Sequence, residues 1–430
     1  MKRLFIALWF LIAGIQESFS QYWEPLGGGM KSIFGTSVYA LVVDTFHDNL
    51  YAGGFIDTAG NTAVQNLALW DGASWYALEN SPENNVAALV MKHDTLIYGT
   101  GLSTVEQIGM YVDTQFVGYL PKLGGILYCL YVFKDTLYAG GEFNGGIKYW
   151  DGSDWKKVGG GVSGFLYQVH AIGEYNGELI VGGLFSDAGG LPVNNIAAWN
   201  GSEWHALGEG ITSDNSYVYA VQEYDGELYV GGNFEEAGDL FTGSIAKWNG
   251  VVWDTVKISD IGTGCGQVYD LASDGFFLYV TGTILSDVGC MGDRVAMFDG
   301  SNWYNLYYSD SNYGFAVVTY NDKIIVGGDV KYGYNSDTIN YIAQFLGYPT
   351  LASENEKENS FQLYPNPASD LLIVRIPDIE SRITILNLLG KAMMELKLYK
   401  RESTIDVSLL PKGIYFVLSN EKFVAPFVKQ

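Results

Sequence analysis

The sequence contains few cysteines and histidines, and this shortage excludes several kinds of functional site. Three cysteines and four histidines in 430 residues provide neither a disulfide framework nor the His/Cys cluster of a zinc or copper site. Nucleophile-elbow, phosphate-loop and EF-hand motifs are also absent from the sequence. We therefore expect no metal and no other cofactor, and we assign no catalytic residue.

Basic residues are scarce as well. Lysine and arginine number 24 against 48 aspartate and glutamate, which gives a formal net charge of −24. The excess of acid precedes residue 361, because residues 361–430 hold nine basic and seven acidic side chains. Such an acidic body repels phosphate backbones and anionic membranes, so nucleic acid is not expected as a partner.

No apolar run in the sequence is long enough to cross a membrane as a permanent helix. The run over residues 4–15 is twelve residues long and follows two basic residues. Ser18 and Ser20 stand where a signal peptidase requires small side chains. Residues 1–20 are therefore predicted to be a signal peptide. We expect the mature chain to lack a transmembrane segment and to be secreted or attached to the outer surface.

Glycine and aromatic residues are abundant, with 54 Gly, 31 Tyr, 22 Phe and 11 Trp. This composition is typical of β structure. A short strand that ends in glycine recurs at spacings of 41 to 50 residues, and such a period indicates a repeat architecture. The seven copies begin at Leu50, Leu96, Leu137, Leu179, Leu228, Leu278 and Ile324.

Each copy has the pattern of four short strands. An apolar strand, a tight turn and the glycine-ended strand come first, followed by a loop, a third strand with an aromatic residue, and a fourth strand that usually opens with Trp. Four antiparallel strands per repeat predict a β-propeller blade. We expect an all-β chain in which residues 21–347 form a seven-bladed β-propeller.

The seventh copy ends near Gly347 without a fourth strand. The chain around Trp23 matches the missing fourth-strand pattern. We therefore expect residues 22–29 to supply the outer strand of the last blade. Such a strand would close the ring and cover the edges that an open ring leaves exposed.

The paired glycines, the aromatic residue of the third strand and the Trp of the fourth make each copy resemble a kelch repeat. This resemblance covers residues 22–347. It implies the propeller fold but no single activity, since kelch-like propellers include binding proteins and a few oxidases.

The pattern changes after the propeller. Residues 348–360 are polar and are predicted to form a linker. Alternating apolar segments in residues 361–430 predict a small, Ig-like antiparallel β-sandwich. The residues that make this segment resemble the type A sorting domain of type IX secretion are Tyr364, Pro365, Asn366, Pro367, Gly390, Lys391, Leu410, Gly413 and Tyr415.

The resemblance to a sorting domain implies a partner and a destination. It implies that the type IX secretion machinery recognises the domain at the outer membrane and then removes it. The cargo would be released or attached to surface lipopolysaccharide. It also implies a bacterium of the Bacteroidota group.

In a four-stranded blade, the loops between strands two and three share one face with the connections between blades. These loops are long in this sequence, so we predict that this long-loop face binds the ligand. Its carboxylates and tyrosines are candidates for binding sugar hydroxyls or Ca²⁺: Asp57, Asp187, Glu235, Glu236, Asp287, Tyr167 and Tyr217. The alternative is that the repeated F-x-x-A-G segment only shapes the loops. Cys265 and Cys290 lie in two loops of blade six on this face and form the candidate disulfide.

Two residues interrupt the pattern of the innermost strands. His170 stands where four other blades have Tyr. Asp270 stands where the other blades are aligned to have Ala40, Ala88, Cys129, Ala171, Ala220 and Val317. A carboxylate among small apolar residues costs free energy unless it is hydrogen-bonded or functional. The alternative for Asp270 is a polar group satisfied by backbone or water, and for His170 a tolerated residue of the central channel.

The scaffold without a catalytic motif favours a secreted or surface-attached binding module whose ligand is an extracellular glycan or protein. One alternative is a secreted carbohydrate-active hydrolase or lyase that uses carboxylates of the long-loop face. Another is a structural component of the cell surface.

Overall fold

The computed structural model describes most of the chain in two units. Contacts divide it into Gln21–Leu346 and a second unit that includes Gly347–Gln430. The predicted signal peptide and linker lie outside the described residues. The residues that the structure describes are 23–32, 35–101, 107–213, 215–256, 266–283, 295–301, 303–306, 313–331, 340–346, 362–364, 368–375, 381–387, 391–400, 402–419 and 422–429.

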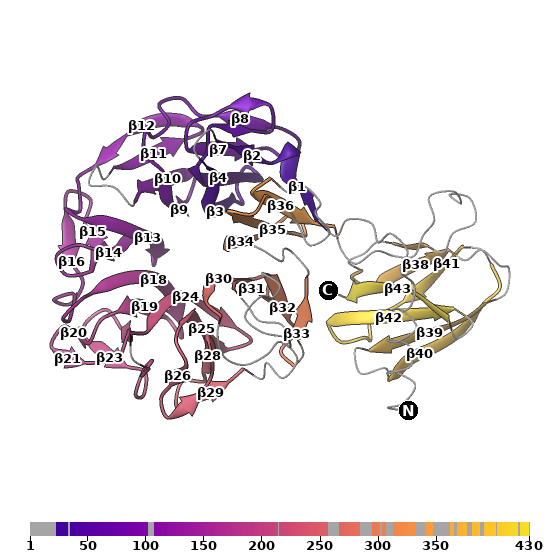
Figure 1. Cartoon of the computed structure of the whole chain (residues 1–430). Coiled ribbons are helices and arrows are strands. Elements are labelled where there is room, and N and C mark those ends of the chain that lie inside the picture. The colour runs from indigo at the N-terminus through magenta and orange to yellow at the C-terminus, as the bar shows by residue number, and fades with distance from the viewer. Residues whose placement is uncertain are drawn as a thin grey trace. The chain divides into compact units, whose positions relative to one another are not determined.

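Among the described residues of the first unit, seven four-stranded antiparallel sheets form the blades of a propeller (Figure 1). Blades 1 to 3 consist of β3 (Ser37–Asp44), β4 (Asn49–Phe55), β7 (Leu67–Trp70) and β8 (Trp75–Ala77); β9 (Val86–Lys92), β10 (Thr95–Thr100), β11 (Ile108–Val112) and β12 (Gln115–Leu120); and β13 (Ile126–Phe133), β14 (Thr136–Glu142), β15 (Ile147–Trp150) and β16 (Trp155–Lys157).

Blades 4 to 6 repeat this order from the centre outwards. They consist of β18 (Gln168–Tyr175), β19 (Glu178–Leu184), β22 (Ile196–Trp199) and β23 (Trp204–Ala206); β24 (Tyr217–Tyr224), β25 (Glu227–Asn233), β28 (Ile245–Trp248) and β29 (Trp253–Thr255); and β30 (Val268–Ser273), β31 (Leu278–Gly282), β32 (Val295–Phe298) and β33 (Trp303–Asn305).

Blade 7 is built from both ends of the propeller sequence. Its strands are β34 (Gly314–Tyr320), β35 (Lys323–Gly328), β36 (Ile342–Phe345) and the N-terminal β1 (Trp23–Pro25). β1 runs antiparallel to β36, with Trp23 opposite Phe345. The prediction that the N-terminal segment closes the last blade is confirmed, although the strand is shorter than residues 22–29 because the 3₁₀ turn η1 (Leu26–Gly28) follows it.

The seven innermost strands form a closed ring. Each of them contacts the innermost strands of both neighbouring blades, and β34 of blade 7 contacts β3 of blade 1. Figure 1 shows these strands around a common centre, with the later strands of each blade farther out. Residues at the two ends of the propeller sequence are therefore neighbours in the fold.

The paired glycines at the end of the second strand explain how the blades pack. In blade 5, a methyl group on Gly231 would overlap Val268 of the next blade, and one on Gly232 would overlap the carbonyl oxygen of Tyr217. The first glycine thus allows close approach of the next blade, and the second allows close approach of the neighbouring strand. Thr281 replaces the first glycine in blade 6, and Gly314 of blade 7 provides the space that its hydroxyl needs.

In blades 1, 3, 4 and 5, the tryptophan that opens the fourth strand is hydrogen-bonded to the preceding blade. The indole Nε1 of Trp75 donates to the Leu26 carbonyl at 2.9 Å, and that of Trp253 donates to the Leu207 carbonyl at 2.7 Å. Trp23 makes the same kind of bond to Leu306 at 2.7 Å. The N-terminal strand therefore takes the part that a fourth strand takes in other blades.

Short hairpins extend three of the loops between strands two and three. The strands are β5 (Thr58–Ala59) and β6 (Thr62–Ala63) in blade 1, β20 (Asp187–Ala188) and β21 (Leu191–Pro192) in blade 4, and β26 (Glu236–Ala237) and β27 (Leu240–Phe241) in blade 5. The first two hairpins are extended by β2 (Met30–Lys31) and β17 (Val162–Ser163) of the connections between blades.

The C-terminal unit has two antiparallel sheets. Their strands, in spatial order, are β37 (Gln362–Tyr364), β38 (Leu371–Arg375) and β41 (Glu402–Asp406), and β40 (Ala392–Leu398), β39 (Ser381–Asn387), β42 (Gly413–Ser419) and β43 (Lys422–Lys429). Buried residues of both sheets, including Val374 and Val417, share one core. The expected β-sandwich is confirmed. No described helix of the chain is long and apolar enough to cross a membrane.

Candidate ligand-binding site

One position of the innermost strands surrounds the centre of the ring with aromatic side chains. In blade 1, Val38 pairs with Gly54 and Ala40 with Gly53, so Tyr39 is the extra residue of a β-bulge. A bulge redirects the side chain that it carries. The same bulge recurs in every blade, and its aromatic residues, which we call the aromatic belt, are Tyr39, Tyr128, His170, Tyr219, Tyr269 and Phe315.

The members of the aromatic belt contact one another from blade to blade. Ring centroids are 4.2 Å apart for Tyr128 and His170 and 5.3 Å apart for His170 and Tyr219. From blade 5 to blade 1, successive centroids are between 5.4 and 5.7 Å apart. Blade 2 interrupts the belt, because its bulged residue is Ala87.

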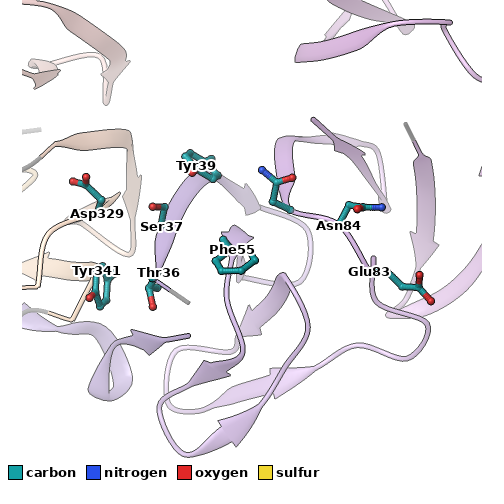
Figure 2. A pocket seen from close by; sticks show the side chains of 10 residues that line it. Thr36, Ser37, Tyr39, Phe55, Glu83, Asn84, Asp329 and Tyr341 are labelled. Atoms are coloured by element: carbon teal, nitrogen blue, oxygen red, sulfur yellow. The ribbon is translucent and has the colours of Figure 1, made fainter. Parts of the chain in front are cut away.

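A pocket of about 650 Å³ lies beside this interruption. Blades 7, 1 and 2 provide its walls, so it depends on the closure of the ring. Figure 2 shows the residues of blade 1 between Asp329 and Tyr341 on one side and Glu83 and Asn84 on the other. The lining residues are Gly35, Thr36, Ser37, Tyr39, Phe55, Glu83, Asn84, Asn85, Asp329 and Tyr341.

The pocket offers hydrogen-bonding groups and aromatic rings without a basic side chain. Its wall contains two carboxylates, two amides, four hydroxyl groups and Phe55. Asp329 accepts a hydrogen bond from the Tyr313 backbone N–H at 2.6 Å. Within the described part of the chain, the side chains of Glu83, Asn84 and Asn85 have no hydrogen-bond partner. These three side chains are available to a ligand.

The corresponding positions of blades 3 and 4 are closed by hydrogen bonds. Glu142, which ends its strand as Phe55 does, accepts from Tyr128 Oη at 3.3 Å and from Gln168 Nε2 at 2.8 Å. His170 Nε2 lies 3.0 Å from Gln168 Oε1. The polar groups there satisfy one another, whereas in the pocket the side chains of Glu83, Asn84 and Asn85 have no such partners among the described residues.

His170 belongs to the aromatic belt and lies outside the pocket. Its ring stacks on Tyr128 with an angle of 19° between the planes. Burial among these rings lowers the pKa of His170 to about 4. The imidazole is therefore neutral near pH 7 and packs as one more aromatic ring of the belt.

Asp270 joins blade 6 to blade 7. Its carboxylate accepts the backbone N–H groups of Leu271 and Val317, each at 2.9 Å. Burial raises the pKa of Asp270 to about 7, and the two backbone hydrogen bonds oppose this shift. The alignment with Val317 was wrong by one residue. Ala316 pairs with Gly327 as Asp270 pairs with Thr281, because Gly314 takes the place that valine has in blade 1.

The acidic candidates that the structure describes, Asp57, Asp187, Glu235 and Glu236, lie in or next to the hairpins, and none of these four lines the pocket. Asp57 accepts a hydrogen bond from Ser32 Oγ at 2.7 Å, and Asp187 accepts one from the Gly190 N–H at 2.9 Å. The N–H groups of Glu235 and Glu236 donate to Ser213 Oγ at 3.0 and 3.3 Å. These contacts stabilise the loops locally.

The tyrosine candidates pack near the centre. Tyr217 stacks on Tyr219 with centroids 5.7 Å apart, and Tyr167 packs against the apolar core between blades 3 and 4. Asp287, Cys265 and Cys290 lie outside the described residues, so the predicted disulfide stays a prediction. In the described segments, no three His, Cys, Asp or Glu side chains are grouped so as to hold a metal ion.

The pocket was missed from the sequence, although one signal for it was present. Ala87 stands in the same aligned position as His170, and it is the smallest residue found there. The contribution of Asp329 and Tyr341 depends on ring closure, which brings the end of the propeller sequence beside its start.

The C-terminal unit matches a known family model. Residues 362–424 match the family described as the secretion system C-terminal sorting domain. The C-terminal unit is a sorting domain. The chain is therefore exported through the type IX secretion system and is secreted or attached to the outer surface, as in Bacteroidota.

Several sorting-motif residues stabilise the sorting domain from inside. Tyr415 is buried, its ring stacks on Phe427 at 5.5 Å, and its hydroxyl donates to the Pro411 carbonyl at 2.7 Å. Leu410 is buried as well, and Gly413 has a φ of +149° that favours glycine. The Lys391 N–H donates to Asn387 Oδ1 at 3.0 Å.

One further motif residue lies in the described part of the chain. Tyr364 ends strand β37. Pro365, Asn366, Pro367 and Gly390 lie outside the described residues.

Three of the solved structures with a similar fold are surface or extracellular proteins of bacteria. PorZ of Porphyromonas gingivalis, an essential surface component of its type IX secretion system, is 14% identical with a TM-score of 0.51, over 93% of this chain and 61% of that one. The extracellular domain of BT4673 from B. thetaiotaomicron is 14% identical with a TM-score of 0.50, over 96% of this chain and 59% of that one.

A second B. thetaiotaomicron extracellular domain, that of BT3049, is 12% identical with a TM-score of 0.50, over 95% of this chain and 57% of that one. The chain thus spans about 60% of the length of these three structures. At such low identity the likeness establishes the β-propeller fold alone. No curated protein sequence matches the chain, and the resemblance to kelch repeats stays a prediction.

Proposed function

We propose that the propeller is a binding module for an extracellular glycan. The observation that carries this proposal is the pocket between blades 7, 1 and 2, whose wall combines open amide, carboxylate and hydroxyl groups with aromatic side chains. A ligand pocket characteristically combines apolar walls with a few converging polar groups. Sugars present both kinds of surface, because their hydroxyl groups form hydrogen bonds and their ring faces pack on aromatic residues.

The lining side chains of the pocket differ in the kind of contact that each can make with a sugar. Tyr39 and Phe55 provide ring faces, and the amides of Asn84 and Asn85 both donate and accept hydrogen bonds. Glu83 accepts hydrogen bonds from sugar hydroxyl groups. Because the protein is exported to the cell surface or beyond, its ligand is expected to be an extracellular molecule. The limited volume of the pocket favours part of a glycan over the broad surface that a folded protein partner requires.

The test is a glycan array probed with the mature full-length chain and two variants. Tyr39→Ala removes the ring that lines the pocket, whereas Tyr269→Ala removes a belt ring that does not line it. We expect the wild type and Tyr269→Ala to bind the same glycans, and Tyr39→Ala to lose about tenfold or more in affinity.

Four results would contradict the proposal. One is an array without any bound glycan, and another is equal binding by both variants. Release of shortened products from a bound glycan would show that the propeller is a carbohydrate-active enzyme and not a binding module. A pull-down from surface extract that recovers a protein ligand at this pocket would also overturn the glycan assignment.

A further inference from the structure

The interruption of the aromatic belt is a local change of side chains on an unchanged backbone. Ala87 is bulged between the pairs Val86 with Thr100 and Ala88 with Gly99, as Tyr39 is bulged in blade 1. Val86 is buried, as is its counterpart Val38. The strand therefore keeps its place in the ring, and only the ring of the side chain is missing.

A second small residue stands beside Ala87. Gly101 follows Gly99 and Thr100 in blade 2, as Phe55 follows Gly53 and Gly54 in blade 1. A methyl group on Gly101 would overlap the Ala87 Cβ. Blade 2 thus has Ala and Gly where blade 1 has Tyr and Phe. Asn85, two residues before Ala87, lines the pocket, and Ala87 is itself partly exposed. The innermost strand of blade 2 therefore has a small side chain next to the wall of the pocket.

The charge of the wall restricts the ligand further. Glu83 and Asp329 line the pocket without a lysine or arginine among the lining residues. The whole chain carries a net charge of −24. This potential repels uronic acids and sulfated or phosphorylated sugars, and it leaves neutral saccharides as the compatible class.

We propose that Ala87 determines the specificity of this pocket by admitting the end of a neutral saccharide chain into the gap of the aromatic belt. In this arrangement the terminal sugar lies between Tyr39 and Ala87, and the amides of Asn84 and Asn85, which line the pocket, bind the following unit. The closed belt on the far side prevents the chain from passing further. This inference rests on the proposed glycan binding and names the sugar class and the end-on mode.

The test compares variants of Ala87 by isothermal titration with the neutral oligosaccharide bound most tightly on the array. Ala87→Tyr restores the belt and fills the gap, whereas Ala87→Ser keeps a small side chain. We expect Ala87→Tyr to weaken binding about tenfold or more and Ala87→Ser to leave it within about twofold. Circular dichroism and the melting temperature verify the fold of each variant, and Ala87→Leu replaces Ala87→Tyr if the larger ring prevents folding.

Two ligand comparisons on the wild type are independent of the variants. The same oligosaccharide with a carboxylate on its terminal sugar should bind at least about tenfold more weakly, and so should one whose terminal sugar carries a bulky cap. Equal binding of the carboxylated or capped ligand, or unchanged binding by the folded Ala87→Tyr variant, overturns this inference. The proposed function would survive that outcome, since it fails only if the wild type binds no glycan.

Discussion

At the scale of single residues, the two glycines that end a second strand meet different neighbours. A side chain on the first would overlap the next blade, as Gly231 and Val268 illustrate, and that contact involves side-chain atoms. A side chain on the second would overlap a backbone carbonyl, as Gly232 and Tyr217 illustrate. A backbone carbonyl in a strand is fixed by the hydrogen bonds of the sheet, so it has little freedom to move away from an added side chain.

Gly232→Ala should therefore destabilise the propeller more than a glycine substitution in open space. Gly226 lies in the turn of the same hairpin with a φ of +76°, and no atom lies within 4 Å of the place that an added methyl group would take. We expect Gly226→Ala to cost about 1 kcal/mol from left-handed strain and Gly232→Ala about 3 kcal/mol from overpacking. Urea denaturation of both variants measures the difference, and the opposite order would refute the explanation of the paired glycines.

Asp270 gives a prediction about pH. Burial raises its pKa to about 7 in the folded protein, whereas an unfolded aspartate has a pKa of about 3.9. Between these values the folded state holds a proton that the unfolded state has lost, so the contribution of Asp270 to stability falls as the pH rises. The other carboxylates contribute the same pH dependence of stability to the wild type and to a variant that lacks only Asp270, so the difference between the two proteins reports on Asp270.

Relative to Asp270→Ala, the wild type should lose melting temperature as the pH is raised from about 5 to about 8. Alanine is the residue found at this position in five other blades, which makes it a conservative choice for the repeat. Melting curves of both proteins at each pH give the comparison. A difference that stays constant, or that favours the wild type with rising pH, would argue against a buried aspartate with a raised pKa.

Residue-level prediction from the sequence succeeded where the repeat is regular. The aligned position of His170 was identified, but the bulge that makes it face the other rings depends on strand register, which the sequence does not display. The same limit displaced Val317 by one position. A polar exception such as His170 stands out from an apolar repeat, whereas a small residue such as Ala87 resembles the other small residues of the innermost strands.

At the scale of elements, β1 is the strand on which the propeller depends most. Trp23 is only 3% exposed, it donates to Leu306, and its ring lies 5.1 Å from that of Phe345. Without this strand the edge of β36 would be exposed to pairing with other chains. The N-terminal strand thus contributes both core packing and edge protection.

Trp23→Ala should lower the stability of the propeller by about 3–5 kcal/mol, as expected for removal of a large buried aromatic residue. Trp23→Phe keeps most of the apolar area and loses the bond to Leu306, so we expect a cost near 1–2 kcal/mol. Thermal denaturation and light scattering measure stability and aggregation. If both variants melt like the wild type, β1 does not close the last blade.

Strands were predictable from the sequence where the turn residues recur at the same spacing as the repeat. The four-strand pattern predicts where the strands of the blades lie because a turn that contains glycine marks the end of many of these strands. The hairpins β5–β6, β20–β21 and β26–β27 were not expected as strands, since each contributes only two residues per strand. Their alanines Ala59, Ala188 and Ala237 are fully buried, which explains why alanine recurs in this loop motif.

At the scale of the whole molecule, destination and binding belong to different units. The sorting domain determines export, and its integrity depends on buried residues such as Tyr415. The pocket belongs to the propeller and contains no residue of the sorting domain. Variants of one unit should therefore leave the property of the other intact.

Tyr415→Ala should reduce the amount of protein at the cell surface, because loss of a buried aromatic residue costs about 3–5 kcal/mol in a small domain. Tyr415→Phe loses one hydrogen bond to Pro411, worth about 1 kcal/mol, and serves as the matched control. Immunoblots of surface, medium and periplasmic fractions give the readout. Normal surface levels of Tyr415→Ala would show that export does not require the folded sandwich.

Closure of the ring by β1 brings Asp329 and Tyr341 of blade 7 beside blade 1 and so forms the pocket. Glu24 and Gln344 are opposite residues of β1 and β36, and their side chains are hydrogen-bonded. The double variant Glu24→Cys and Gln344→Cys should therefore form a disulfide on mild oxidation, detected by mass spectrometry of peptides. Glu24→Cys paired with Gln222→Cys in blade 5 should not form one. Failure of the 24–344 pair to cross-link in the folded protein, or cross-linking of both pairs alike, would contradict the closed ring and the pocket that depends on it.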